Sequence, residues 1–240
     1  MIARPMNYLI YNGKSIADFN AYISGGGTFS SPEVAYKVVE IPGRNGDLIL
    51  GGDRYKNVTV SYESWILEDF EESIRNLRNF FLANPGYHRL EDTYHPDEYR
   101  MALYAGPFDP EVLYLSAANF TMEFNCRPQR YLKDGEVPRD YTENGTIYNP
   151  TFFNSKPILR VFGKGVLTIG DYTVTISSES EYDYINIDCD NMECFNGTNN
   201  CNALVSINHL DFPILPPGET EIALGEGITE IKIWPRWWML

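Results

Sequence analysis

Alternation between apolar and polar side chains is the feature that most restricts how this chain can fold. Every second residue is apolar over residues 58–62 and again over residues 120–124. A period of two is that of a β-strand with one face against a core and the other in water. The 17 Tyr and 13 Phe residues also favour packed sheets. We therefore expect a mainly β protein.

Only one segment has the longer period of a helix. Its apolar residues recur at spacings of four, three and four: Phe70, Ile74, Leu77 and Phe81. This spacing places them on one face of an α-helix, which we expect to pack on a sheet. Asp69 and Glu72 have the spacing of a capping box, and Pro85 stops the helix because the residue before a proline avoids helical angles. The predicted helix covers about residues 69–83.

A turn-forming segment lies before the apolar run at residues 48–50. Its Asn45-Gly46 pair suits a tight type I′ turn, because both central residues of that turn need a positive φ. This pattern predicts a projecting β-hairpin. The residues expected at its end are Pro42, Gly43, Arg44, Asn45, Gly46 and Asp47.

The second half of the chain has a different pattern. Residues 133–149 are polar and rich in turn-forming pairs, so we interpret them as the junction between two domains. Short strands separated by turns, without a helix, predict an antiparallel β-sandwich of about 100 residues. The expected domains are residues 1–135 and 136–240. Seven strands are expected in the second, at residues 158–162, 166–169, 172–176, 184–187, 203–207, 221–224 and 228–234.

Charge and hydropathy exclude several classes of function. The net charge is −14 and the 19 Lys and Arg residues form no cluster, so we expect no binding to nucleic acid. No stretch approaches the roughly 18 apolar residues of a membrane span, and the first residues lack the apolar core of a signal peptide. We therefore expect a protein made and kept in a cytosol. Its cysteines are then expected to be reduced thiols: Cys126, Cys189, Cys194 and Cys201.

No motif predicts a metal, a cofactor or a catalytic residue. Cys189, Cys194 and Cys201 have His209 nearby, but their spacing lacks the paired C-x2–4-C knuckles of structural zinc sites. Nothing in the sequence marks a histidine as an oriented base beside a nucleophile. We expect none of these sites.

Two other classes of function have candidate residues in the sequence. A carbohydrate-binding protein would use an aromatic platform, for which the candidates are Trp234, Trp237 and Trp238, although a strand pattern before Pro235 favours their burial. A glycosidase would use a pair of carboxylates, such as Glu91 with Asp92 or Asp188 with Asp190. With 33 acidic residues, chance adjacency accounts for such pairs.

The order of motifs resembles the N-terminal region of siphophage distal tail proteins, the Dit-like or Sipho_tail family of phages and prophages of Gram-positive bacteria. The most specific matches are Pro-Gly-Arg-Asn-Gly at residues 42–46 and Phe-x-Cys-Arg-Pro at residues 124–128. The strand ending at Trp65-Ile66, the following helix and the segment at residues 89–100 have the family's order. The ending at residues 233–240 is also similar. The resemblance covers residues 1 to about 132 well.

This resemblance implies a fold and a function. The fold is an N-terminal split β-barrel or sandwich with one α-helix and a β-hairpin extension, followed by a galectin-like or carbohydrate-module-like sandwich. Residues 1–135 of six copies would form a ring at the virion tail tip, assembled in the host cytoplasm, with residues 42–47 as the candidate subunit contact. The ring would join the major tail tube protein to the tail-associated fibre or lysin protein. Receptor-binding proteins are further expected partners. During ejection, the DNA would pass through the lumen of the ring. A soluble carbohydrate-binding sandwich is the alternative function.

Overall fold

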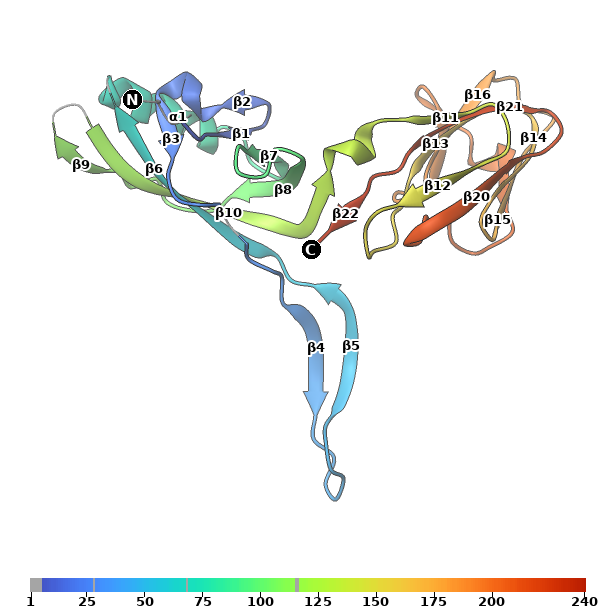
Figure 1. The fold of residues 1–240 in the computed structure, drawn as a ribbon, viewed down its shortest axis with the longest axis horizontal. Coiled ribbons are helices and arrows are strands. Elements are labelled where there is room, and N and C mark those ends of the chain that lie inside the picture. The colour runs from blue at the N-terminus through green and yellow to red at the C-terminus, as the bar shows by residue number, and fades with distance from the viewer. Residues whose placement is uncertain (1–5, 28, 68, 115–116) are drawn as a thin grey trace. The chain divides into compact units, whose positions relative to one another are not determined.

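The computed structural model describes residues 6–27, 29–67, 69–114 and 117–240. It divides into two compact units, of which the first ends at Arg130 and the second runs from Tyr131 to Met239. Both consist mainly of antiparallel strands, and the first contains the single α-helix of the described residues (Figure 1). The predicted mainly β fold is confirmed.

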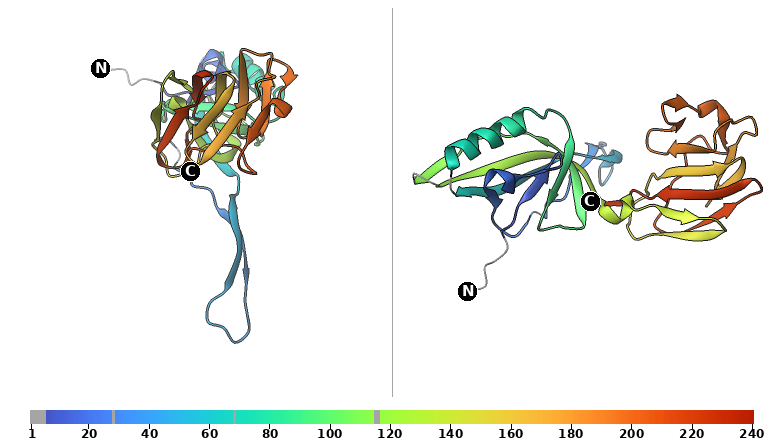
Figure 2. Two further views of the ribbon diagram at one scale, coloured as in Figure 1. Left: turned by 90° about the vertical axis from the view of Figure 1, so that its right-hand side faces the viewer. Right: turned by 90° about the horizontal axis from the view of Figure 1, so that it is seen from above.

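One curled sheet, which closes half of a barrel, organises the first unit (Figure 2). Its strands lie in the order β2-β1-β7-β8-β10-β6-β3. A further strand, β9, is outside this order and pairs with β10. The short 3-10 helix η1 (Ile16–Phe19) connects β2 to β3. The strands are β1 Leu9–Tyr11, β2 Lys14–Ser15, β3 Ala21–Ile23, β6 Val58–Leu67, β7 His88–Asp92, β8 Glu98–Tyr104, β9 Glu111–Tyr114 and β10 Ala117–Leu132.

Strands β6 and β10 show how the alternating pattern forms this sheet. Residues 58–67 pair antiparallel with residues 117–126. The apolar side chains of both strands, such as Val60 and Met122, are fully buried, whereas alternate residues such as Glu123 are exposed. Burial of one face stabilises the sheet, and a slip of one residue would expose that face, so the register is fixed.

Helix α1 (Phe70–Leu82) covers the predicted segment. Leu77 and Phe81 are buried in the core of the first unit. Phe70 and Ile74 are partly buried against the same core. The predicted apolar face is therefore confirmed.

The start of this helix differs from the prediction. Asp69 is the N-cap residue, but its backbone is left-handed, with φ 40°, and its side chain makes no capping hydrogen bond. A capping side chain reaches the free N–H groups when the N-cap backbone is extended. The predicted capping box of Asp69 and Glu72 is therefore wrong. At the other end, Ala83 follows the last helical residue, in agreement with a stop before Pro85.

Strands β4 (Val34–Val39) and β5 (Leu48–Tyr55) form a two-stranded sheet of their own, which confirms the predicted hairpin (Figure 1). The predicted type I′ turn is wrong. Gly43 and Gly46 each have a φ of 82°, but Asn45 is not among the described residues with a positive φ. Residues 40–47 separate the strands, so a longer loop reverses the chain and glycine alone supplies its positive φ angles.

The second unit is an antiparallel sandwich, as predicted. One sheet has the order β11-β21-β13-β16-β17-β18 and the other β12-β20-β14-β15-β19. Leu159 and Ile231 of the first sheet are buried in the same core as Leu167 and Ile222 of the second. The strands are β11 Arg139–Tyr141, β12 Gly145–Asn149, β13 Ile158–Gly163, β14 Gly165–Ile169, β15 Tyr172–Ile176, β16 Tyr184–Asp188, β17 Glu193–Asn196, β18 Asn199–Asn200, β19 Val205–Ile207, β20 Gly218–Leu224 and β21 Ile228–Trp234. A further short strand, β22 Trp238–Met239, belongs to neither of these sheets and pairs with β10.

The polar segment at residues 133–149 is more ordered than its composition indicates. It contains the 3-10 helix η2 (Lys133–Glu136) and then strands β11 and β12, each at the edge of one sheet. The predicted strand at residues 203–207 is shorter than expected, because η3 (Asn202–Leu204) occupies its beginning. Strands β17 and β18 were not predicted. Strands of four and two residues are too short to show a period of two.

Two turns of the second unit meet backbone to backbone. Gly227 has a φ of 87°, and a Cβ atom there would collide with the carbonyl oxygen of Lys164. The N–H of Lys164 donates to the carbonyl oxygen of Gly227 at 3.0 Å. Only glycine combines this backbone angle with so close an approach.

Candidate subunit-contact site

The six residues predicted as a subunit contact lie in the loop that joins β4 to β5. Each residue from 41 to 50 is exposed. None of the residues from 34 to 55 belongs to the buried core of the first unit among the described residues. The hairpin therefore presents its whole length to solvent or to a partner.

The strands of this hairpin carry apolar side chains on both faces. Val38 lies opposite Ile49, and on the same face Tyr36 lies opposite Gly51. Their exposed fractions are 47% for Val38, 62% for Ile49 and 55% for Tyr36. The other face carries Leu48 and Leu50, with 37% and 47% exposed. A two-stranded sheet in water has no core of its own, and exposed apolar surfaces of this kind are typical of protein–protein contact sites.

The base of the hairpin is fixed by polar contacts. The N–H of Lys56 donates to the carbonyl oxygen of Glu33 at 2.8 Å, and the Lys56 ammonium lies 3.0 Å from the Glu33 carboxylate. Both side chains are largely exposed, so the ion pair contributes little to stability. The backbone pairing gives the hairpin its shape, and its apolar faces remain available.

A second surface of the first unit is acidic. A hollow of about 600 Å³ lies over the exposed face of β6 and β10. Four carboxylates line it: Glu63, Asp109, Glu111 and Glu123. No Lys or Arg is among the described residues around the hollow. This face repels polyanions and attracts cations.

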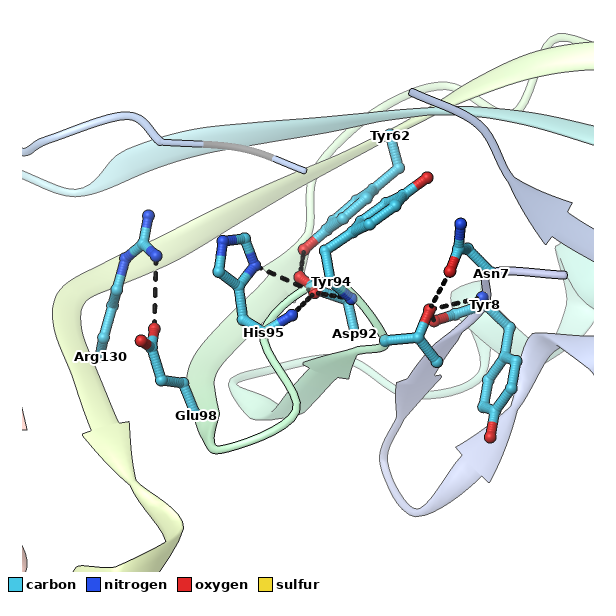
Figure 3. A network of polar contacts seen from close by, with 9 residues as sticks. Asn7, Tyr8, Tyr62, Asp92, Tyr94, His95, Glu98 and Arg130 are labelled. Atoms are coloured by element: carbon cyan, nitrogen blue, oxygen red, sulfur yellow. Dashed lines mark hydrogen bonds and ion pairs between the residues drawn. The ribbon is translucent and has the colours of Figure 1, made fainter. Parts of the chain in front are cut away.

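A network of hydrogen bonds holds the turn between β7 and β8 (Figure 3). One oxygen of Asp92 accepts from the backbone N–H groups of Tyr94 at 3.0 Å and His95 at 2.8 Å. The same oxygen lies 3.1 Å from the His95 Nδ1 atom. The other oxygen accepts from the Tyr62 hydroxyl at 2.7 Å, and burial together with the Asp92 charge raises the pKa of Tyr62 well above its usual value. These contacts connect the turn to β6.

Two arginines lie beside this network. Arg130 pairs with Glu98 at 3.3 Å (Figure 3). Arg100 of β8 is only 7% exposed, and two of its guanidinium nitrogens, Nη1 and Nη2, have no acceptor among the described residues. Burial, followed by the charge of Arg130, lowers the pKa of Arg100, although an arginine stays protonated at neutral pH. The sequence contained a signal that Arg100 is buried, because Arg100 and the buried Ala102 are two residues apart in one strand and so share a face.

The carboxylate pairs considered for a glycosidase are engaged in structural contacts. Asp92 belongs to the network described above, and Glu91 pairs with Arg89 at 2.5 Å. Asp188 accepts two hydrogen bonds from Arg236, at 2.8 and 3.0 Å. Burial alone would raise the pKa of Asp188, but the hydrogen bonds and charge of Arg236 outweigh it and the pKa is lowered. The lowered pKa of Asp188 is the opposite of what a general acid requires.

The remaining Asp, His and Cys candidates are dispersed. Asp190 lies 3.3 Å from Lys156. His88 Nε2 and His209 Nε2 each contact a backbone carbonyl oxygen, at 3.1 and 3.0 Å. Within the described ranges, no three His, Cys, Asp or Glu side chains are placed to hold a metal ion.

All four cysteine side chains are buried. Burial raises the pKa of Cys126 to about 11 and that of Cys194 to about 12, and it raises the pKa of Cys189 still further. Because the thiolate is the reactive form, these thiols are poor nucleophiles in the folded state.

The three tryptophans at the end of the chain do not form one platform. Trp237 is 1% exposed. The Arg160 guanidinium lies over Trp234, 5.3 Å from the ring centroid. Trp238 stacks on Phe153 with centroids 4.5 Å apart. The predicted burial is confirmed for Trp237, while Trp234 and Trp238 are half-buried.

No helix in the described part of the chain is long and apolar enough to cross a membrane. No protein-family model matches the chain, and no curated protein matches it.

The fold of the chain is shared with a structural protein of the phage hub class. That protein is Dit (gp 19.1) of phage SPP1, whose crystal structure is described as a paradigm of the hub adsorption apparatus in phages that infect Gram-positive bacteria. The likeness has a TM-score of 0.75 at 16% sequence identity, and it covers 98% of this chain and 100% of that chain. The two chains therefore share a fold over nearly their whole length.

Proposed function

We propose that this protein is a structural hub protein of a siphophage or prophage tail tip, and that it catalyses no reaction. The observation that carries the proposal is the likeness to SPP1 Dit over 98% of the chain. β-Sandwiches occur in many unrelated proteins, so a match of the second unit alone would carry little weight. A match that also includes the half-barrel, its helix and its hairpin is far more specific.

The hub is a ring of six copies. A ring needs a head-to-tail interface in which one surface of each copy meets a different surface of the next. The hairpin of β4 and β5 is well suited to supply one of these surfaces, because its strand edges and both apolar faces are free. The loop residues Pro42, Gly43, Arg44, Asn45, Gly46 and Asp47 then contact the neighbouring subunit.

The partners follow from the place of such a ring in a tail. One side of the ring binds the major tail tube protein, and the other binds the tail-associated fibre or lysin protein. Residues 136–240 form a galectin-like sandwich that carries receptor-binding proteins, while residues 1–135 form the ring. The ring assembles in the host cytoplasm and functions at the tip of the virion tail.

The acidic hollow gives the negative charge of the chain a role in this proposal. Ejected DNA must pass the ring without adhering to it. A lumen lined by carboxylates repels phosphates, and the four acidic side chains over β6 and β10 are suited to this task. The protein binds no nucleic acid sequence.

The alternative, a soluble carbohydrate-binding protein, depended on an aromatic platform. Burial of Trp237 removes one ring from that platform. No contact among the described residues favours this function over the tail hub, and we do not propose it as a second function.

Light scattering and negative-stain imaging over a range of protein concentrations test the proposal. We expect a six-fold ring from the full chain. Ile49→Asp places a charge on the exposed face of the hairpin and should abolish the ring. Val166→Asp, at an exposed apolar position of the second unit, is the matched control and should leave it intact. A monomer at every concentration, or a ring indifferent to Ile49→Asp, would contradict the proposed interface.

A further inference from the structure

Arg100 is a buried charge to which no carboxylate of the described residues is bonded. Its side chain points from β8 into the half-barrel, and the residue is 7% exposed. Neither Nη1 nor Nη2 has a hydrogen-bond acceptor among the described residues. Burying an arginine in this way is costly unless an acceptor of negative charge reaches it.

The nearby carboxylates are already engaged. Glu98 pairs with Arg130. Asp92 has both oxygens occupied, one by backbone N–H groups and His95 and the other by the Tyr62 hydroxyl. Arg130 is itself 8% exposed and repels the Arg100 charge. Asp92 and Glu98 balance the two arginines in formal charge, but no acceptor in the described part of the chain bonds the Nη1 or Nη2 atom of Arg100.

A small cavity adjoins these residues. Its volume is about 20 Å³, and its lining includes Tyr62, Asp92, Glu98, Arg100 and Arg130. One water-sized particle requires roughly 10 to 15 Å³ of such space, so the cavity admits one small particle.

We propose that this cavity is a binding site for one chloride-sized anion, held by Arg100. A water molecule would accept a hydrogen bond from the guanidinium but would bring no negative charge into contact with it. A monoatomic anion supplies both the acceptor and the charge, and it also relieves the repulsion between the two arginines. The bound ion ties β8 to the end of β10 in the first unit. The site is independent of the proposed role in the tail.

The first test compares unfolding of the full chain in sodium chloride and in sodium gluconate at equal ionic strength. Gluconate is too large for the cavity. An ion that binds only the folded state stabilises it by mass action, so Tm should rise by roughly 3 to 6 °C for each tenfold increase in chloride above the dissociation constant. Hydrogen exchange should slow at residues 98–104 and 126–130 in chloride, and it should not change in the second unit.

Arg100→Met keeps the apolar stem and removes the charge. In this variant the chloride dependence of Tm and of hydrogen exchange should disappear, while the control Arg44→Met on the exposed loop should retain both. Crystals of the unaltered protein grown in bromide should show one anomalous peak beside Arg100, which decides the question even if Arg100→Met does not fold.

Three results would overturn the proposal. These are equal unfolding of the unaltered protein in chloride and gluconate, an unchanged chloride dependence in Arg100→Met, and a water molecule without bromide signal beside Arg100.

Discussion

Replacing Leu77 by alanine tests whether helix α1 contributes to the core of the first unit. Leu77 is completely buried, with neighbours from the helix and the sheet in one core cluster. The substitution removes three carbon atoms, each worth about 0.8 kcal/mol of transfer free energy, or roughly 2 to 3 kcal/mol in total. The cavity left behind adds to this loss because a packed core relaxes only in part. We expect the free energy of unfolding to fall by roughly 2 to 5 kcal/mol.

Denaturant unfolding followed by the helical circular dichroism signal measures this loss. The helical signal reports on the first unit, because α1 is the only α-helix in the described residues. Arg78→Ala, on the exposed face of the same helix, is the control and should change stability by less than about 0.5 kcal/mol. Equal, small losses for both substitutions would show that the packing of the apolar face has been misassigned.

Four further outcomes are expected. Residues 1–135 alone should form a hexamer by light scattering, and deleting residues 43–47 should prevent it; a hexamer formed by residues 136–240 would contradict this. Gly227→Ala should destabilise the second unit by about 2 kcal/mol or more in thermal unfolding, because the new Cβ atom would collide with the Lys164 carbonyl oxygen and the backbone has a positive φ. Gly197 also has a positive φ but open space around it, so the control Gly197→Ala should cost less. The lowered pKa of Asp188 means that its bond to Arg236 stabilises the fold above the ordinary pKa of about 3.9, and that this contribution is lost as pH falls through the folded-state pKa. Arg236→Met should therefore remove that part of the pH dependence of unfolding. An unchanged dependence on acid pH in this variant would refute the role of the ion pair. Elemental analysis should find no tightly held stoichiometric zinc, and a cell-wall hydrolysis assay no turnover; either signal would overturn the structural assignment.

Long regular patterns were readable from the sequence. The spacing of Phe70, Ile74, Leu77 and Phe81 predicted the helix and its buried face, because four apolar residues on one face leave few alternatives. The alternation at residues 58–62 predicted β6 in the same way. Such patterns report burial directly, and burial determines the fold.

Local backbone geometry was not readable. Asp69 and Glu72 have the residue types of a capping box, yet the backbone enters the helix through a left-handed residue. Asn45-Gly46 is typical of a two-residue turn, yet a longer loop separates the end of β4 at Val39 from the start of β5 at Leu48. In both places several conformations differ little in free energy, and contacts with distant residues select one of them.

The polar site escaped prediction for a related reason. Arg100, Asp92 and Tyr62 lie on three different strands, and only the curvature of the sheet brings them together. A charged residue in an alternating pattern marks a position to inspect, but the sequence does not identify which carboxylates are already engaged elsewhere.

The burial of the cysteines makes the unaltered protein its own reporter of local opening. A thiol reagent reacts with a buried cysteine only when the surrounding structure opens. Cys126 lies in the first unit, and Cys189, Cys194 and Cys201 lie in the second. Mass spectrometry distinguishes a chain with one label from a chain with three. A single labelling time course therefore measures how often each unit opens, separately and without any substitution.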